Sequence, residues 1–153
     1  MPLLARILLL LAALLATPLL AAAQAVPGAS GEEMQRAIAT ARRTLPQFWE
    51  RVRANAPSET GYAVKIVASD QHGAEHVWLS RLRMRGGRIV GTIDTKPRIV
   101  RSLRQGQELP VNEDAIVDWM YFRNGLIVGN ETGRAMLRAL PREEAEKLLK
   151  LYE

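Results

Sequence analysis

The spacing of hydrophobic and polar residues divides this chain into a helical part, a strand-rich part and a second helical part. Between residues 30 and 54, apolar side chains recur every three to four positions, which is typical of amphipathic helix. Ser30 with Glu33 forms a capping box at the start. A second N-cap pattern begins at Thr44, with Pro46 in the first turn, where its missing N–H costs nothing. The pattern therefore predicts two consecutive helices.

From residue 61 the hydrophobic period changes to two, which is typical of strands with one buried face. In the longest run we expect Trp78, Leu82 and Met84 to share one face. Gly86-Gly87 marks a turn, and the link that follows Lys96-Pro97 contains a predicted helical turn at 99–103. The predicted strands cover residues 61–67, 75–85, 88–94 and 108–111.

Asn124-Gly125 is the strongest hairpin signal, because both residue types accept the positive φ that a type I′ turn requires. A two-residue loop pairs Tyr121 with Val128 and places Trp119 opposite Asn130. Directly opposed side chains lie on one face, so the side chain of Asp118 is expected on the other.

Two helices are predicted after this hairpin. Thr132 is expected to cap the first, and Pro141 begins the second. Their expected buried residues are Met136, Leu137, Leu140, Ala145, Leu148, Leu149 and Tyr152. Together the elements predict one α+β domain over residues 26–153. In it a curled antiparallel sheet, either open or closed into a barrel-like form, packs with N-terminal and C-terminal helices.

The first residues have the pattern of a secretory signal peptide. Arg6 precedes an apolar stretch at 7–15, Pro18 interrupts it, and small-x-small cleavage patterns end at residues 23 and 25. The stretch is shorter than the roughly 20 residues of a membrane-spanning helix. We therefore expect residues 1–25 (or 1–23) to be removed, the protein to reach the periplasm or the exterior, and the mature chain to have no stable membrane span.

Composition narrows the possible chemistry. The 153 residues include no cysteine, which excludes disulfides and thiol chemistry, and 21 Lys and Arg exceed 16 Asp and Glu. A basic exported protein suits a periplasmic protein partner or an anionic envelope component, and we expect no nucleic-acid partner in that compartment. No motif indicates a cofactor.

The segment from His72 to His76 spells a metalloprotease pattern, H-x-x-E-H, that requires a helix. In a strand at about 3.3 Å per residue the two histidines stand roughly 13 Å apart, so we predict no metal site. Glu75 and His76 remain catalytic candidates if Asp118 joins them from another strand. The alternative is a strand histidine satisfied by a backbone carbonyl.

Acidic, aromatic and amide side chains concentrate in two neighbouring stretches, 118–121 and 129–134. The candidate binding residues are Trp119, Tyr121, Asn130, Thr132 and Arg134. Arg134 carries a planar fork suited to a carboxylate or phosphate, or to a structural pair with Asp118 or Glu131.

Several ordered blocks carry a family resemblance: Ala63-Val64-Lys65, Glu75-His76-x-Trp78, Asp118-Trp119-Met120-Tyr121, and Gly129-Asn130-x-Thr132-x-Arg134. In these blocks the chain resembles the YegJ-like bacterial family, catalogued as domain of unknown function 2314. The resemblance implies a small α+β domain, often exported, without an established activity.

The function expected from these observations is a non-enzymatic binding or interaction module in the periplasm, because no complete catalytic set is present. One alternative is a periplasmic hydrolase that uses Glu75, His76 and Asp118. Another is an immunity protein that neutralises a toxin.

Overall fold

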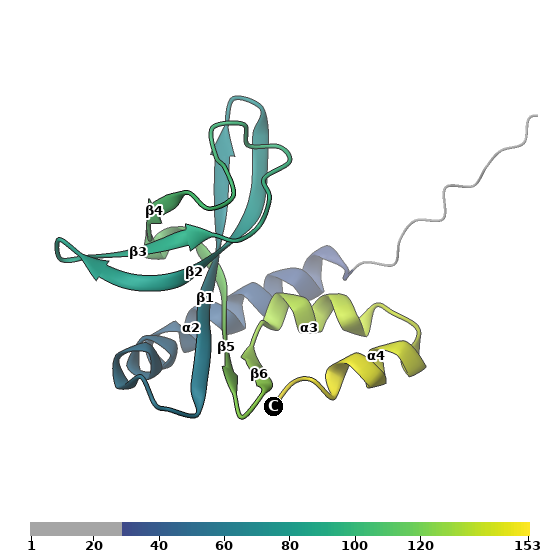
Figure 1. Ribbon diagram of the computed structural model, residues 1–153. Coiled ribbons are helices and arrows are strands. Elements are labelled where there is room, and N and C mark those ends of the chain that lie inside the picture. The colour runs from purple at the N-terminus through teal and green to yellow at the C-terminus, as the bar shows by residue number, and fades with distance from the viewer. Residues whose placement is uncertain (1–28) are drawn as a thin grey trace, which may run out of the picture.

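The computed structural model describes residues 29–153, and the predicted signal peptide lies outside them. Figure 1 shows a long helix behind a twisted sheet and two short helices at the C-terminal end. The elements are α2 (Gly31–Ala54), β1 (Glu59–Asp70), β2 (Gly73–Arg85), β3 (Arg88–Ile93), β4 (Glu108–Pro110), a 3₁₀ turn (Glu113–Ala115), β5 (Ile116–Arg123), β6 (Leu126–Gly129), α3 (Glu131–Arg138) and α4 (Arg142–Leu149). None of these helices is long and apolar enough to cross a membrane.

The sheet has the strand order β4-β3-β2-β1-β5-β6, and every pair is antiparallel. The α+β class with helices at both ends is confirmed. Of the two forms expected for the sheet, the open one is present, because β4 and β6 lie at opposite edges and do not pair. Both edge strands are short, three and four residues, which leaves little backbone to join them.

Helix α2 is continuous through the position where two helices were predicted. The capping box of Ser30 and Glu33 is confirmed. Thr44 does not cap a second helix, since its hydroxyl donates to the backbone carbonyl of Thr40, inside the first one. Pro46 loses one helical hydrogen bond, but buried residues on both sides of it pack against the same sheet. Packing of the buried face of α2 against the sheet therefore outweighs the N-cap pattern at Thr44.

The core lies between α2 and one face of the sheet, and its centre is aromatic. Phe48 stacks on Trp119 with ring centroids 5.2 Å apart, and Trp119 stacks on Tyr121 at 6.1 Å. The indole N–H of Trp119 donates to the carbonyl of Ala41 at 2.9 Å. Such offset aromatic contacts add to the free energy gained by burial, so they fix β5 onto the helix.

A β-bulge changes the faces of β2. Arg81 has φ of 49°, and the pairing with β3 shifts register between Ser80 and Arg83. Before the bulge Val77 and Leu79 are fully buried. The extra residue reverses the alternation, so Trp78 lies on the opposite face from Leu82, and the expectation that they share a face is wrong.

The hairpin register is confirmed as far as Met120 and Gly129, where the pairing ends, so Trp119 and Asn130 do not form the expected pair. Tyr121 pairs with Val128, and Phe122 pairs with Ile127. Asn124 and Gly125 have φ of 50° and 83°, as a type I′ turn requires.

The C-terminal helices agree only in part with the sequence pattern. Pro141 precedes α4, and Ala145 is buried, both as expected. Met136 is 54% exposed instead of buried, because Thr132 and Ala135 are the residues of α3 that face the rest of the protein.

A charged cluster joins the end of α2 to the start of β1. The carboxylate of Glu59 is almost fully buried and accepts hydrogen bonds from Arg51, Arg123 and the hydroxyl of Tyr62. Hydrogen bonds from Arg51, the largest influence, hold the pKa of Glu59 at about 2, against an ordinary value of 4.5. The charged form is therefore the one that the fold stabilises.

We expect Glu59→Gln to lower the free energy of unfolding by about 2 kcal/mol at neutral pH, because two arginines lose their shared anion. The folded pKa lies below the unfolded one, so the contribution is present above pH 4.5 and is lost as the pH falls towards about 2. Urea unfolding of both proteins across this range should show the difference between them shrinking. Glu50→Gln, the same chemical change at an exposed position of α2 next to Arg51, is the control. A pH-independent difference would contradict the prediction.

A candidate site on the outer face of the sheet

Asp118 lies on the face of β5 turned away from α2, yet it is completely buried. Its carboxylate accepts hydrogen bonds from the backbone amides of Trp119 (2.9 Å), Glu131 (3.1 Å) and Thr132 (2.8 Å), and from the Thr132 hydroxyl. Two of these amides belong to the first turn of α3, where unpaired donors favour an anion. Asp118 is thus the cap of α3, supplied from a neighbouring strand.

Thr132 does not cap α3, contrary to expectation. The chain enters the helix through Asn130 in the left-handed conformation (φ 55°), without a side-chain cap bond. Thr132 therefore falls inside the first turn, 2% exposed, with its hydroxyl between Asp118 and a lysine.

That lysine is Lys65 of β1. It lies at the centre of the site, and the sequence did not predict it as a site residue. Its ammonium donates to the Thr132 hydroxyl at 2.6 Å and lies 4.7 Å from the centre of the Trp78 ring. Burial lowers its pKa, and the negative charge of Asp118 opposes that shift. The sequence does contain a signal for this residue, namely a lysine within the apolar run 62–67. A strand interior seldom accommodates a charge without a partner, so this lysine indicates a partnered charge.

Strand register explains why these residues meet. Lys65 pairs with Trp78 of β2 on one side and with Asp118 of β5 on the other. Directly paired residues in antiparallel strands place their side chains on the same face. Three separate sequence blocks therefore form one row across the sheet.

The catalytic candidates do not form a set. Glu75 accepts hydrogen bonds from the backbone amides of Arg98, Ile99 and Val100, so it organises the link after β3, which contains turns in place of the predicted helical turn. No hydrogen bond or ion pair joins Glu75 or His76 to Asp118 within residues 29–153.

His76 also lacks the carboxylate neighbour proposed for it. Partial desolvation, and then the charge of Lys65, lower its pKa, whereas a partner carboxylate would raise it. His72 lies in the turn before β2, while His76 pairs with Val67 within the strand. The described part of the chain holds no group of three or more side chains suited to a metal ion.

The predicted binding residues separate into two sets. Trp119 and Tyr121 are core residues, 8% and 2% exposed, so they offer no stacking surface. Of the two structural partners expected for Arg134, Asp118 is not reached and Glu131 is. Arg134 contacts Glu131 at 3.7 Å and the carbonyl of Glu153 at 2.8 Å, and it lies over the Tyr152 ring.

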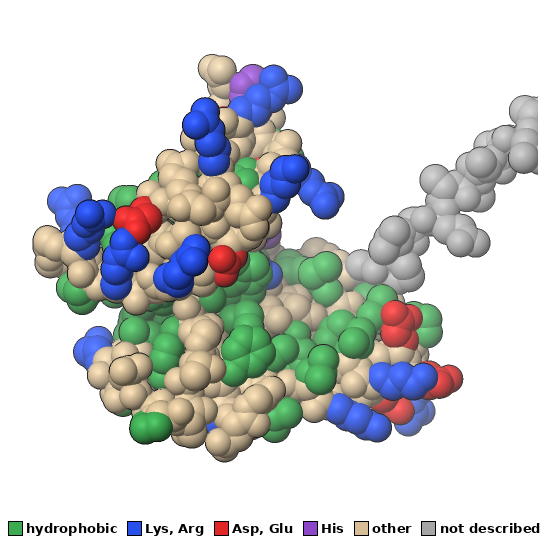
Figure 2. Space-filling view, in the orientation of Figure 1, with side chains coloured by type: hydrophobic (Ala, Val, Ile, Leu, Met, Phe, Trp, Pro, Cys, Tyr) green, Lys and Arg blue, Asp and Glu red, His purple; other side chains and the backbone are tan. Residues whose placement is uncertain are grey.

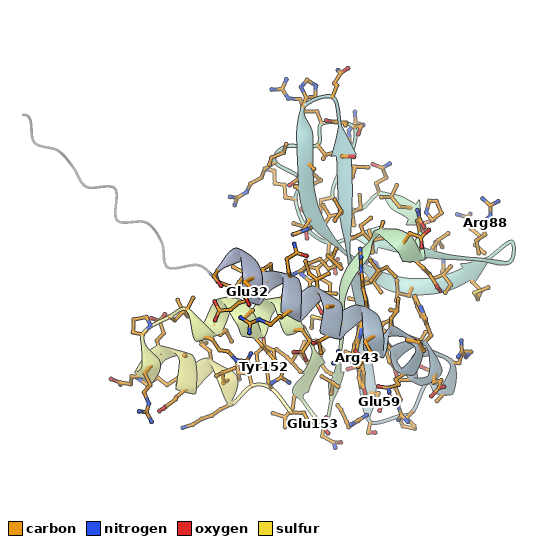
Figure 3. The ribbon with its side chains drawn as sticks, turned by 180° about the vertical axis from the view of Figure 1, so that it is seen from behind. Glu32, Arg43, Glu59, Arg88, Tyr152 and Glu153 are labelled. Atoms are coloured by element: carbon orange, nitrogen blue, oxygen red, sulfur yellow. The ribbon has the colours of Figure 1, made fainter. Side chains whose placement is uncertain are left out.

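Asn130 belongs to the same C-terminal arrangement as Arg134. Its side-chain amide donates to the Tyr152 hydroxyl at 2.8 Å. Asn130 and Arg134 therefore attach the chain end beside β6, where Tyr152 bridges to Ile127. The labelled Tyr152 and Glu153 lie close together at this end of the molecule in Figure 3.

A shallow depression of about 340 Å³ lies beside the lysine row. Trp78, Ala63, Met120 and Phe122 form its apolar surface, and Asp94 lies at its edge. Trp78 thus belongs to both features, as it also packs on Lys65. Figure 2 looks onto this face and shows hydrophobic side chains gathered across β1, β5 and β6 and towards α3. Phe122 is 36% exposed and Val67 is 40% exposed, so both hydrophobic side chains add to the apolar surface on this face.

The fold and this surface define a small α+β protein with an open antiparallel sheet, an aromatic core on one face and an apolar surface with a lysine-centred row on the other. The chain belongs to the family described as an uncharacterized protein conserved in bacteria (DUF2314), whose model matches residues 31–151.

Two curated relatives support this assignment. The uncharacterized protein YegJ of Escherichia coli K12 is 34% identical over 121 residues, which cover 79% of this chain and 78% of the relative. A putative ankyrin repeat protein of Neisseria meningitidis serogroup B is 31% identical over 121 residues, 74% of this chain but only 48% of that protein. No solved structure matches the chain.

Proposed function

We propose that this protein is an exported, periplasmic binding module that holds a partner protein on the outer face of its sheet. The observation that carries the proposal is the apolar surface around Trp78, Met120 and Phe122, which no element of residues 29–153 covers. Aromatic residues and methionine are enriched at protein interfaces, and buried aromatic anchors supply much of the binding energy there. The signal-peptide pattern at residues 1–25 supports the location.

The buried row beneath this surface supports the same proposal. The Thr132 hydroxyl contacts both Lys65 and Asp118, and the Trp78 ring packs on Lys65, so the surface rests on fixed side chains. Pre-organised side chains lose less conformational entropy on binding. The hydrolase alternative requires Glu75, His76 and Asp118 to converge on one substrate, and their hydrogen bonds run to different parts of the chain.

Site-specific photocrosslinking in living bacteria tests the proposal. A photoreactive residue at position 122 should give a discrete covalent adduct with one protein in the periplasmic fraction, and Met120→Asp should remove it. The control position is Arg43, exposed on α2 on the opposite side of the molecule (Figure 3). Equal adducts from both positions, no adduct from position 122, or a protein retained in the cytoplasm would overturn the proposal.

A further inference from the structure

A second concave surface lies on the other side of the sheet. It is a groove of about 730 Å³ between the C-terminal part of α2 and the β2–β3 hairpin. Trp49 and Val52 of α2 form one wall, and Leu82, Met84 and Ile89 form the other. The volume falls within the roughly 300–1,000 Å³ of small-molecule sites.

The bulge at Arg81 creates this groove. By reversing the alternation, it turns Leu82 and Met84 towards α2, and the hairpin then runs on past the end of the helix (Figures 1 and 3). Met84 is 66% exposed as a result. Leu82 and Ile89 pack in part against the core, so the exposed apolar surface of this wall is largest at Met84.

Trp49 supplies the second observation. Its side chain is 7% exposed, and its indole N–H is the one buried side-chain donor or acceptor in the described residues without a hydrogen-bond partner. A buried indole normally finds an acceptor, and an unpaired buried donor costs about 1–3 kcal/mol. Trp49 also lines the groove, but its indole nitrogen is enclosed, so an acceptor oxygen of an occupant reaches it only when the Trp49 side chain turns towards the groove.

The charged residues around the groove indicate the sign of the charge that an occupant would carry. Arg53, one helical turn after Trp49, and Arg88 on the hairpin both line it, and neither forms an ion pair among the described residues. Arg83 is neutralised by Glu108, and Glu113 is the single acidic residue in the lining. Residues four apart on a helix are neighbours, so Arg53 and Trp49 lie on one face of α2.

We propose that this groove binds a single-chain anionic amphiphile, a long-chain fatty acid carboxylate. The carboxylate accepts hydrogen bonds from Arg53 and, once the Trp49 side chain turns towards the groove, from its indole N–H. The acyl chain lies along Leu82, Met84 and Ile89. A peptide strand fits less well, because the nearby backbone is already paired: Ile89 accepts from Val111 and pairs with Met84. The site is separate from the outer face, so it goes beyond the proposed partner binding.

Titration calorimetry on the protein expressed from the full chain tests the proposal, with dodecanoate, dodecyltrimethylammonium and dodecanol as probes below their aggregation concentrations. Dodecanoate should bind one to one and at least about tenfold more tightly than the cationic and neutral probes. Arg53→Glu should lower the affinity for dodecanoate at least about tenfold. Arg101→Glu, the same charge change at an exposed distant position, should change that affinity less than about twofold.

Two further variants separate binding from folding. Met84→Glu places an acid in the groove at an exposed position and should weaken the binding of dodecanoate. Met136→Glu, at an exposed position on α3, should leave this binding unchanged. Trp49→Phe should lower the affinity for dodecanoate about fivefold and leave the circular dichroism spectrum unchanged. Absence of binding at millimolar dodecanoate, equal affinity for the three probes, or equal effects of Arg53→Glu and Arg101→Glu would overturn the proposal. Tighter binding of a short acidic apolar peptide would overturn it as well.

Discussion

Replacing Asp118 with alanine is expected to lower the free energy of unfolding by about 3–5 kcal/mol, the largest single effect that this structure predicts. The carboxylate is fully buried and accepts four hydrogen bonds, two of them from the first backbone amides of α3. Alanine leaves these donors unpaired in a site that water does not reach, so the cost of their desolvation adds to the loss of the bonds.

Lys65 makes the loss greater. The charge of Asp118 raises the pKa of Lys65 against the effect of burial. Without it, the half-buried ammonium keeps only the Thr132 hydroxyl and the Trp78 ring as partners. The pKa of Lys65 should therefore fall further in the variant.

Urea unfolding followed by circular dichroism measures the change. Asp118→Asn keeps one acceptor oxygen and should cost less than alanine, and Asp114→Ala, at an exposed position in the preceding turn, is the control. Hydrogen exchange should show the amides of Glu131 and Thr132 losing protection first, because Asp118 caps them. A loss below about 1 kcal/mol would mean that the carboxylate is not structural and would reopen its role in chemistry.

Gly129→Ala is expected to lower the free energy of unfolding by about 3 kcal/mol. The residue has φ of 80°, which costs an alanine about 1 kcal/mol. An added Cβ would also lie 2.5 Å from the carbonyl oxygen of Trp119 and 2.6 Å from its ring. Neither group is free to move, because the carbonyl accepts from Asn130 and the ring stacks on Phe48. Overpacking of this kind typically adds about 1–3 kcal/mol.

Gly125→Ala separates strain from packing. Gly125 has nearly the same φ, 83°, and no atom within 4 Å of an added Cβ. It should lose only about 1 kcal/mol. Near-ultraviolet circular dichroism should change in Gly129→Ala, where the indole of Trp119 is displaced, and not in Gly125→Ala. Equal losses of stability in the two variants would show that the close approach to Trp119 is unimportant.

Features that depend on neighbouring residues were predictable from the sequence. The capping box at Ser30, the type I′ turn at Asn124-Gly125 and the strand around His76 all follow from short-range backbone preferences. That strand assignment, now confirmed, was the ground for predicting no metal site at the H-x-x-E-H pattern, which requires a helix.

Features that depend on distant contacts were not predictable in this way. The start signal at Thr44 is locally correct, yet α2 continues because its buried stripe packs on the sheet across Pro46. The bulge at Arg81 reverses the faces of β2, so counting alternate residues from Trp78 gives the wrong partners. Sequence alternation cannot show a bulge, because the register is set by the paired strand.

The candidate site shows the same division. The sequence by itself determined the family, the α+β class and the concentration of polar and aromatic residues in the blocks around Asp118 and Thr132. Only the tertiary structure decided that Trp119 and Tyr121 belong to the core, that Asp118 caps α3, and that Lys65 and Trp78 complete the outer row. The physical reason is that strand pairing joins residues far apart in the chain, and which face each occupies depends on bulges and on the packing of α2 and α3.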